Sequence, residues 1–98
     1  MWLKITKSAQ AGSLESCDIL ISIEPGKQNS GVTIKLESPA LKQFGEVIKQ
    51  EILEVIKKFD VTDIIINAVD KGALTYCIKA RTETVLRRAI GELKDVTK

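Results

Sequence analysis

The chain has no histidine among its 98 residues. Histidine is the commonest general base near neutral pH and the commonest metal ligand. Its absence excludes Ser-His and Cys-His nucleophile pairs and leaves a metal site without its usual ligand. The aspartates at positions 18, 60, 63 and 70 are scattered and form no clear acid–base pair. The sequence therefore predicts no catalytic residues, no metal site and no enzyme activity for the chain alone.

Cysteines and long apolar runs are also scarce. Cys17 and Cys77 lie far apart and match no metal-binding spacing. Small secreted domains usually carry more than two cysteines, so two free thiols in a reducing compartment are expected. No stretch has the pattern of a signal peptide, and none reaches transmembrane length. These absences favour a cytoplasmic protein that is not attached to a membrane.

Strong charge and aromatic side chains are missing as well. The formal net charge is +2, and aromatic residues make up 4% of the chain. A nucleic-acid-binding surface needs grouped basic residues, and RNA-binding sheets also use aromatics on their open face. No nucleic-acid partner is therefore predicted. What the chain does contain is 44% hydrophobic residues, mainly Ile, Leu and Val, which suffice for the core of a single domain over residues 1–98.

Two stretches alternate between apolar and polar residues and predict strands. In residues 17–24 the apolar face holds Cys17, Ile19, Ile21 and Ile23. Residues 25–31 contain Pro, Gly, Asn and Ser and predict a loop. Residues 32–37 alternate again. The two strands are expected to form an antiparallel hairpin with one solvated face.

A long helix and a second β-α unit follow. Ser38 is expected to cap the helix, with Pro39 in its first turn. Its apolar stripe recurs at three- and four-residue spacing and consists of Leu41, Phe44, Val47, Ile48, Ile52, Val55, Ile56 and Phe59. Residues 61–69 predict a central strand, because Ile64, Ile65 and Ile66 are apolar without alternation. After a turn at residues 70–72, a helix is expected over residues 73–90. Cys77 lies on its predicted inner edge, and Arg81 is the one charged residue of that edge.

The order β-β-α-β-α predicts an α+β two-layer sandwich: a small, mostly antiparallel sheet with both helices on one face. We expect the strand at 17–24 to lie between the other two, so that all neighbouring strands are antiparallel. Residues 1–16 are expected to be a flexible lead-in, with a short edge strand near Trp2 to Ile5. Residues 92–98 are expected to be a frayed tail.

Two loop segments are candidates for function. Ser16 is a primary hydroxyl among small residues, flanked by Glu15 and Asp18, and an outside enzyme could reach it. The two acidic neighbours could help to position a metal–phosphate donor. Lys71-Gly72, between a strand and a helix, could receive an anion on its backbone N–H groups, although a plain turn fits the same residues.

The run Ala11-Gly12-Ser13-Leu14-Glu15-Ser16-Cys17-Asp18 resembles the modification site of the acyl carrier subunit (gamma chain) of citrate lyase. That family shows Gly-Thr-Leu-Glu-Ser-Gly-Asp or close variants there. The similarity continues at Lys42-Gln43-Phe44-Gly45. It extends through Asp70-Lys71-Gly72-Ala73-Leu74, Cys77-Ile78 and Ala80-Arg81, so it spans most of the chain.

The resemblance implies a carrier that is inactive alone. In that family the serine of the Leu-Glu-Ser triplet carries 2′-(5″-triphosphoribosyl)-3′-dephospho-coenzyme A through a phosphodiester, and the matching residue here is Ser16. The arm's thiol holds acetyl and then citryl groups during cleavage of citrate to acetate and oxaloacetate. The implied partners are the alpha (transferase) and beta (lyase) chains and the prosthetic-group transferase.

Two departures from the family's motif and two alternatives remain. Cys17 stands where the family usually has glycine, and Ser13 where it commonly has threonine, so Ser13 is a second hydroxyl near Ser16. One alternative is the carrier subunit of malonate decarboxylase, which uses the same kind of prosthetic group. The other is a small α+β binding module without a prosthetic group.

Overall fold

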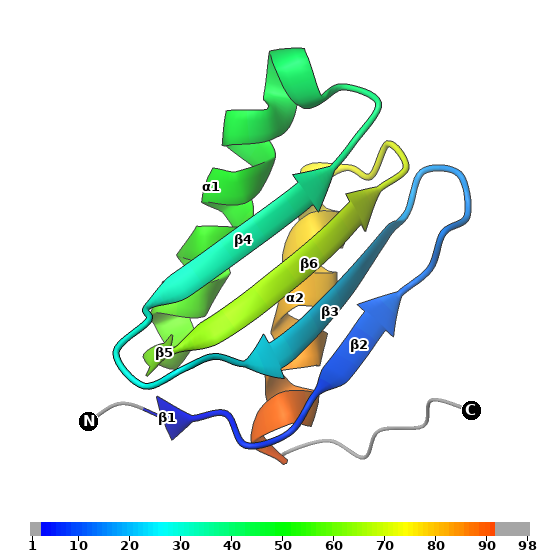
Figure 1. Cartoon of the computed structure of the whole chain (residues 1–98). Coiled ribbons are helices and arrows are strands. Elements are labelled where there is room, and N and C mark those ends of the chain that lie inside the picture. Colours follow the sequence, from blue (N-terminus) through cyan, green and yellow to red (C-terminus); the bar gives the residue numbers. More distant parts are fainter. Residues whose placement is uncertain (1–2, 92–98) are drawn as a thin grey trace.

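The computed structural model describes residues 3–91 and contains one four-stranded sheet with two helices packed on one of its faces (Figure 1). The predicted α+β two-layer class is therefore confirmed. The element bounds are β1 Leu3–Lys4, β2 Ala9–Gly12, β3 Ile19–Pro25, β4 Val32–Glu37, α1 Leu41–Phe59, β5 Val61–Thr62, β6 Ile64–Asp70 and α2 Thr75–Ile90.

The sheet has the order β2-β3-β6-β4, with β2-β3 and β3-β6 antiparallel and β6-β4 parallel. The predicted order, with the strand near 17–24 in the middle and only antiparallel neighbours, is wrong. β6 lies in the middle, because a strand of continuous isoleucines is best buried between two neighbours. The connection from β3 to β4 does not form a hairpin but passes the start of β6, where Gly26 N–H donates to the Asp63 carbonyl (2.7 Å).

The core lies between the sheet and the two helices. Alternate residues of β3 and β6 point into it, and Ile19, Ile21, Ile64 and Ile66 are all fully buried or nearly so. The helices contribute the apolar side chains of their inner faces: Ile48, Ile52, Val55 and Ile56 from α1, and Ile78, Val85, Leu86 and Ala89 from α2. None of the helices described within residues 3–91 is long and apolar enough to cross a membrane.

The N-terminal part has more structure than the sequence indicates. Residues 9–12, within the expected lead-in, form β2 on the edge of the sheet, and Ala9 and Ala11 are buried. In residues 9–12 the small alanines alternate only weakly in hydropathy with their neighbours, so the sequence does not predict this strand. The expected edge strand near Trp2 to Ile5 corresponds to β1, which pairs in parallel with β5. The expected tail at 92–98 lies outside the described residues.

The first part of α1 differs from the prediction in two ways. The helix begins at Leu41, after Ala40, because the Ser38 hydroxyl forms a turn by accepting the Ala40 N–H (3.1 Å). Leu41, Phe44 and Val47, three members of the predicted inward stripe, are about half exposed at 47%, 52% and 53%. The stripe is therefore buried only from Ile48 onward, since the sheet does not extend beneath the first turns.

Candidate functional site

The segment that holds Ser16, residues 13–18 (the Ser16 loop), joins β2 to β3. Its base is closed by Ser13 N–H donating to the Ile19 carbonyl (3.2 Å). Gly12, just before it, has φ +97°, and an added Cβ would lie 1.8 Å from the Ile19 carbonyl oxygen. Only glycine fits where the two strands approach so closely.

Backbone hydrogen bonds join the Ser16 loop to the turn between β6 and α2, more than 50 residues further along the chain. Cys17 N–H donates to the Lys71 carbonyl (2.8 Å), and Lys71 N–H donates to the Asp18 carbonyl (2.9 Å). Strand register puts this turn beside the loop, because Ile19 pairs with Asp70. Glu37 pairs with Val69, so the start of α1 lies at the same end of the sheet (Figure 1). We call this end the Ser16 end.

The two serines of the loop lie in different environments. The half-buried Ser13 hydroxyl donates to Asp18 Oδ2 (2.6 Å) and accepts the Glu15 N–H (3.2 Å). Ser16 is exposed in the turn, and its hydroxyl hydrogen-bonds to no group within the described residues 3–91. An outside reagent therefore meets Ser16 with its oxygen free, whereas Ser13 would first have to break its bond to Asp18.

Asp18 holds the loop through its carboxylate. Arg81 of α2 donates to both oxygens, from Nε to Oδ1 (3.2 Å) and from Nη2 to Oδ2 (3.0 Å), and Ile19 N–H donates to Oδ1 (2.7 Å). The Arg81 guanidinium, followed by the Ser13 hydroxyl, holds the pKa of Asp18 well below its usual value. Because both oxygens are engaged, Asp18 is not the metal–phosphate ligand suggested by the sequence; Glu15 remains exposed.

The two cysteines form no disulfide within the described residues. Cys17 lies in the exposed turn with φ +66°, so the prediction that it belongs to the apolar face of the strand is wrong; β3 begins two residues later. A left-handed backbone favours glycine, the residue that the citrate lyase motif given above has at this position. Cys77 is half-buried and its Sγ lies 3.3 Å from Asp18 Oδ1; burial is the main cause that raises its pKa.

The predicted anion site at Lys71-Gly72 does not exist as such. The Lys71 N–H already donates to the Asp18 carbonyl. The Gly72 and Ala73 N–H groups donate to Asp70 Oδ1 at 3.1 and 2.9 Å. The buried Asp70 also accepts the Ser38 hydroxyl at Oδ2 (2.8 Å), which ties the turn to the start of α1. These residues make a plain turn with internal hydrogen bonds.

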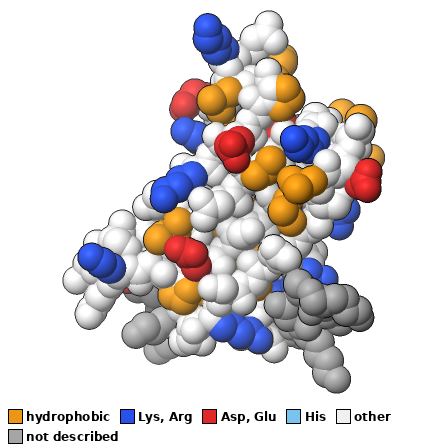
Figure 2. Space-filling view, turned by 45° about the vertical axis from the view of Figure 1, so that its right-hand side comes forward, with side chains coloured by type: hydrophobic (Ala, Val, Ile, Leu, Met, Phe, Trp, Pro, Cys, Tyr) orange, Lys and Arg blue, Asp and Glu red, His pale blue; other side chains and the backbone are white. Residues whose placement is uncertain are grey.

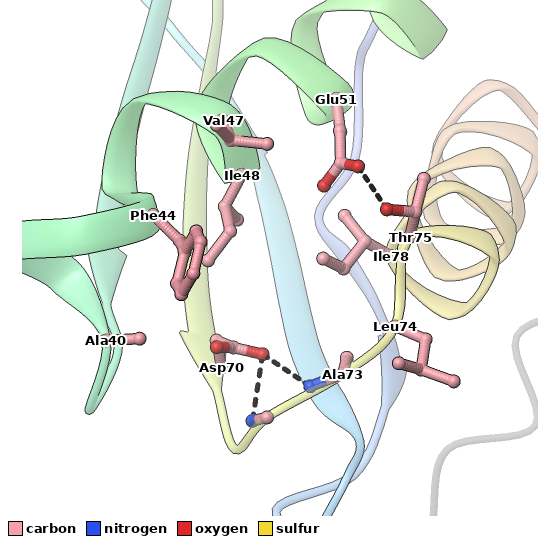
Figure 3. Close-up of a pocket in the computed structure, with 11 residues that line it drawn as sticks. Ala40, Phe44, Val47, Ile48, Glu51, Asp70, Ala73, Leu74, Thr75 and Ile78 are labelled. Atoms are coloured by element: carbon pink, nitrogen blue, oxygen red, sulfur yellow. Dashed lines mark hydrogen bonds between the residues drawn. The ribbon is translucent and has the colours of Figure 1, made fainter.

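A groove of about 370 Å³ opens next to this turn, between α1 and α2 (Figure 3). Phe44 and Ile48 project into it from α1, opposite Ile78 of α2. One wall is the turn itself, from Gly72 to Thr75. Thr75 donates its hydroxyl to Glu51, which bridges the two helices along the groove.

Large apolar side chains are exposed at this end of the molecule, and three of them, Phe44, Val47 and Leu74, line the groove. Those that are at least 47% exposed among the described side chains come from the Ser16 loop, the first turns of α1 and the start of α2: Leu14, Leu41, Phe44, Val47, Leu74 and Tyr76. All of these segments meet at the Ser16 end. Figure 2 shows apolar side chains grouped on the upper part of the molecule, among scattered charges.

Comparison with known proteins identifies the family. The profile described as ACP, malonate decarboxylase delta subunit (MdcD), matches residues 6–89. The chain is 47% identical to the citrate lyase acyl carrier protein of Streptococcus uberis, over 91% of this chain and 86% of the relative. It is 42% identical to that of Halothermothrix orenii, over 98% of this chain and 100% of the relative.

The chain belongs to the citrate lyase acyl carrier protein family. Members of this family are carrier subunits without catalytic activity of their own, so the prediction of a non-catalytic carrier is confirmed. An acyl carrier protein works through a covalently attached prosthetic group and alongside partner subunits. The described residues contain no cluster of three or more His, Cys, Asp or Glu side chains that could hold a metal ion.

A solved structure shares the fold of this acyl carrier protein. A chain of a Pseudomonas malonate decarboxylase hetero-tetramer, crystallised with malonate, superposes with a TM-score of 0.75 at 21% identity, covering 92% of this chain and 90% of that one. The likeness supports the overall fold.

Sequence reasoning located Ser16 but missed the residues that hold its loop in place. The sequence offered one signal for Arg81, a charged residue on the predicted inner edge of a helix. Such a residue needs a buried or half-buried acidic partner. The partner, Asp18, is 63 positions away, and only the β3-β6 pairing and the packing of α2 bring the two together.

Proposed function

We propose that this chain is the acyl carrier subunit of citrate lyase and that Ser16 Oγ is its attachment point for 2′-(5″-triphosphoribosyl)-3′-dephospho-coenzyme A. The contrast between the two serines supports this assignment most directly. Ser16 is exposed with an unengaged hydroxyl, whereas Ser13 is half-buried and bonded to Asp18. Both lie in the loop between β2 and β3, whose two ends are joined by the hydrogen bond from Ser13 N–H to the Ile19 carbonyl.

Attachment requires little from the carrier itself. Ser16 Oγ bonds to the first phosphorus of the triphosphate, the bond from that phosphorus to the next bridging oxygen breaks, and diphosphate leaves. The serine proton passes to a base of the transferase, because no basic side chain of the loop contacts Oγ within the described residues. The product is a phosphodiester.

The residues around Ser16 fit such a group. A phosphodiester adds a negative charge close to Asp18, but Arg81 already compensates the Asp18 charge. Ser16 and its neighbours Leu14 and Glu15 are exposed, so a bulky nucleotide meets no wall. When attached, the group supplies the thiol that carries acetyl and citryl thioesters, while the protein supplies tethering and recognition.

The partners proposed are the alpha chain, which exchanges acetyl for citryl, and the beta chain, which cleaves the citryl thioester. A tethered acyl group visits both active sites at a high effective concentration. The alternative is the carrier of malonate decarboxylase, which is favoured by the matching family profile and by the shared fold. The identities of 42–47% to citrate lyase carriers favour the citrate system.

Intact mass and peptide mapping of the protein from its own citrate-grown cells test the proposal. We expect a mass increase on Ser16 equal to the mass of the triphosphate donor less the diphosphate that leaves. Ser16→Ala should abolish it, and the matched variant Ser13→Ala should retain it. An unmodified chain isolated together with its partner subunits would contradict the assignment. Loading only under growth on malonate would favour the alternative.

A further inference from the structure

We propose that the apolar surface of the Ser16 end is the docking surface for the enzyme that transfers the prosthetic group to Ser16. We define this surface as the groove between α1 and α2, which Phe44, Val47 and Leu74 line, together with the exposed Leu14 of the loop and Tyr76 at the start of α2. The inference rests on the proposed function, because it presupposes that Ser16 is the serine that is loaded.

The exposure of these side chains is unusual for a protein with so few aromatics. Tyr76 and Leu74 are 74% and 62% exposed, and Phe44, half of the chain's phenylalanine content, is 52% exposed. Exposed apolar patches rimmed by polar residues mark interaction sites. Aromatic and leucine side chains around a concave centre are the typical anchors of a protein interface.

The docking surface is continuous with the Ser16 loop. Lys71 bonds to Cys17 and Asp18 through its backbone, and the next residues, Gly72 to Thr75, form a wall of the groove. Leu14 lies in the loop itself. A protein that contacts Ser16 and the turn at Lys71 therefore also reaches this wall of the groove.

Geometry favours the loading enzyme over the subunits that process the acyl group. Those subunits act on the thiol at the tip of a long arm, so they can dock at a distance from Ser16. The loading enzyme must bring its active site to Ser16 Oγ itself. Only for this partner is contact with the surroundings of Ser16 a geometric necessity.

Charge supports the same partner. The enzyme binds a triphosphate donor, so the rim of its active site must be cationic. Beside the groove, Glu46 and Glu51 lie on one side of α1, and Glu54 is paired with Lys79 of α2 (3.0 Å). Glu15 is exposed next to Ser16. Lys42 and Lys71 are also exposed at the Ser16 end, so the carrier's surface there carries charges of both signs. The acidic side chains Glu46 and Glu51 are the ones that lie beside the groove.

The test measures loading of Ser16 by the purified transferase and its triphosphate-activated donor, followed by intact mass. Phe44→Ala/Leu74→Ala should lower kcat/KM about tenfold or more through KM. Glu46→Lys should lower it severalfold, with a weaker dependence on salt. The matched controls are Thr33→Ala and Glu24→Lys, which are exposed on β4 and at the end of β3 and should load at the wild-type rate.

A binding measurement separates docking from chemistry. Each substitution is combined with Ser16→Ala, so that the carrier cannot be loaded, and the Kd for the transferase is measured by calorimetry. Phe44→Ala/Leu74→Ala in the Ser16→Ala background should weaken binding by about the same factor by which it lowers kcat/KM in the loadable protein. Its thermal unfolding should match that of Thr33→Ala in the same background.

The outcomes distinguish the two hypotheses. If the wild type gains no mass at Ser16, the proposed function fails. If the wild type loads and the double variant loads and binds equally well, the docking surface is wrong. If the double variant loads normally but, once loaded, reacts poorly with the alpha or beta chain, the surface belongs to those subunits and the inference is overturned.

Discussion

The two ends of the sheet are both closed by long-range hydrogen bonds, but they differ in the side chains that they leave uncovered. At the end opposite Ser16, the loop between β3 and β4 is held against the start of β6 by Gly26, Gly31, Asp63 and Ile64. Two backbone hydrogen bonds, Gly26 N–H to the Asp63 carbonyl (2.7 Å) and Ile64 N–H to the Gly31 carbonyl (3.0 Å), join the loop to the strand. In addition, Gly31 N–H donates to Asp63 Oδ1 (3.0 Å). At the Ser16 end, backbone hydrogen bonds join the loop to Lys71, and the side chains of Ser13, Asp18 and Arg81 add further hydrogen bonds.

The difference shows what each end is built for. At the opposite end, the loop from β3 to β4 passes the start of β6. No large apolar side chain among the described residues is exposed at this end. The Ser16 end fixes the base of a loop while leaving the Ser16 hydroxyl and several large apolar side chains uncovered. A fold optimised only for stability would bury such residues, so their exposure points to a partner.

The largest expected effect compares one glycine from each end. Gly12→Ala places a Cβ 1.8 Å from the Ile19 carbonyl oxygen at φ +97°, so β2 and β3 must separate. Gly31→Ala has a similar backbone, φ +72°, but meets no atom within 4 Å. We expect Gly12→Ala to cost at least roughly 2 kcal/mol of unfolding free energy and Gly31→Ala about 1 kcal/mol.

Urea unfolding of both variants tests this difference. Loading of Ser16 should also slow in Gly12→Ala, since the loop loses its base, and should stay unchanged in Gly31→Ala. Equal losses of stability would show that the close approach of β2 and β3 is not a constraint, and that the two ends depend on their glycines in the same way.

The second effect concerns the ion pair between Asp18 and Arg81 at the Ser16 end. Arg81→Met keeps the apolar stem of the side chain but leaves the carboxylate of Asp18, whose side chain is 14% exposed, with weaker compensation. We expect a loss of about 1–2 kcal/mol, and faster amide exchange at Cys17 and Ile19. Lys79→Met removes an exposed pair with Glu54 and should cost less than about 0.5 kcal/mol.

The double variant Asp18→Asn/Arg81→Met measures the coupling. If the two single losses simply add, the contact does not hold the loop. A coupling near the single-variant loss would confirm that Asp18 and Arg81 act as one unit.

These residues also show how far the sequence leads. Alternating isoleucines correctly predicted the inward face of β3, because burial on one face of a strand leaves a period of two in the sequence. The uninterrupted isoleucines of β6 did not reveal which of them point inward. Sheet order was not recorded in this way. The continuous run Ile64 to Ile66 indicates a central strand, but the short loop at 25–31 also fits a hairpin between the strands that flank it. The hydrogen bonds of Gly26 and Gly31 that prevent this hairpin join residues more than 30 positions apart, so no local pattern reveals them.

The site divides along the same line. Ser16 was found because its local run matches a family, whereas the engagement of Ser13 depends on Asp18 and Arg81. Phe44 and Val47 were assigned to the core because periodicity reports a face of a helix and not how far the sheet extends beneath it. Apolar side chains that contact a partner protein and apolar side chains that fill the core recur at the same helical spacing, so the sequence does not distinguish them.

The dependence on pH should distinguish the Ser16 loop by its resistance to acid. Since the pKa of Asp18 is lowered in the folded protein, its contribution to stability is fully present above about 3.9, the usual value for an unfolded chain. It is lost as the pH falls through the lower folded value. NMR shifts of Cys17 and Ile19 should therefore stay constant from pH 7 to about 4 and change below it.

Asp18→Asn is the control for this titration. It should remove the part of the acid dependence that belongs to the loop and leave the remaining carboxylates unchanged. A titration of these two amides near pH 4 or above in the wild type would contradict the strong Asp18–Arg81 contact, because an unpaired aspartate titrates there.

The smallest effect concerns Cys17, which occupies a left-handed position with φ +66°. Cys17→Gly relieves backbone strain in the folded state but gives the unfolded chain more freedom, so the two terms largely cancel. We expect a change in unfolding free energy within about 0.5 kcal/mol, with a stabilising sign. Cys17→Ala keeps the strain while removing the thiol, and should not stabilise. If both variants gave the same stability, the strain at this position would be negligible, and the glycine of related sequences would need a different explanation, such as room for the approaching transferase.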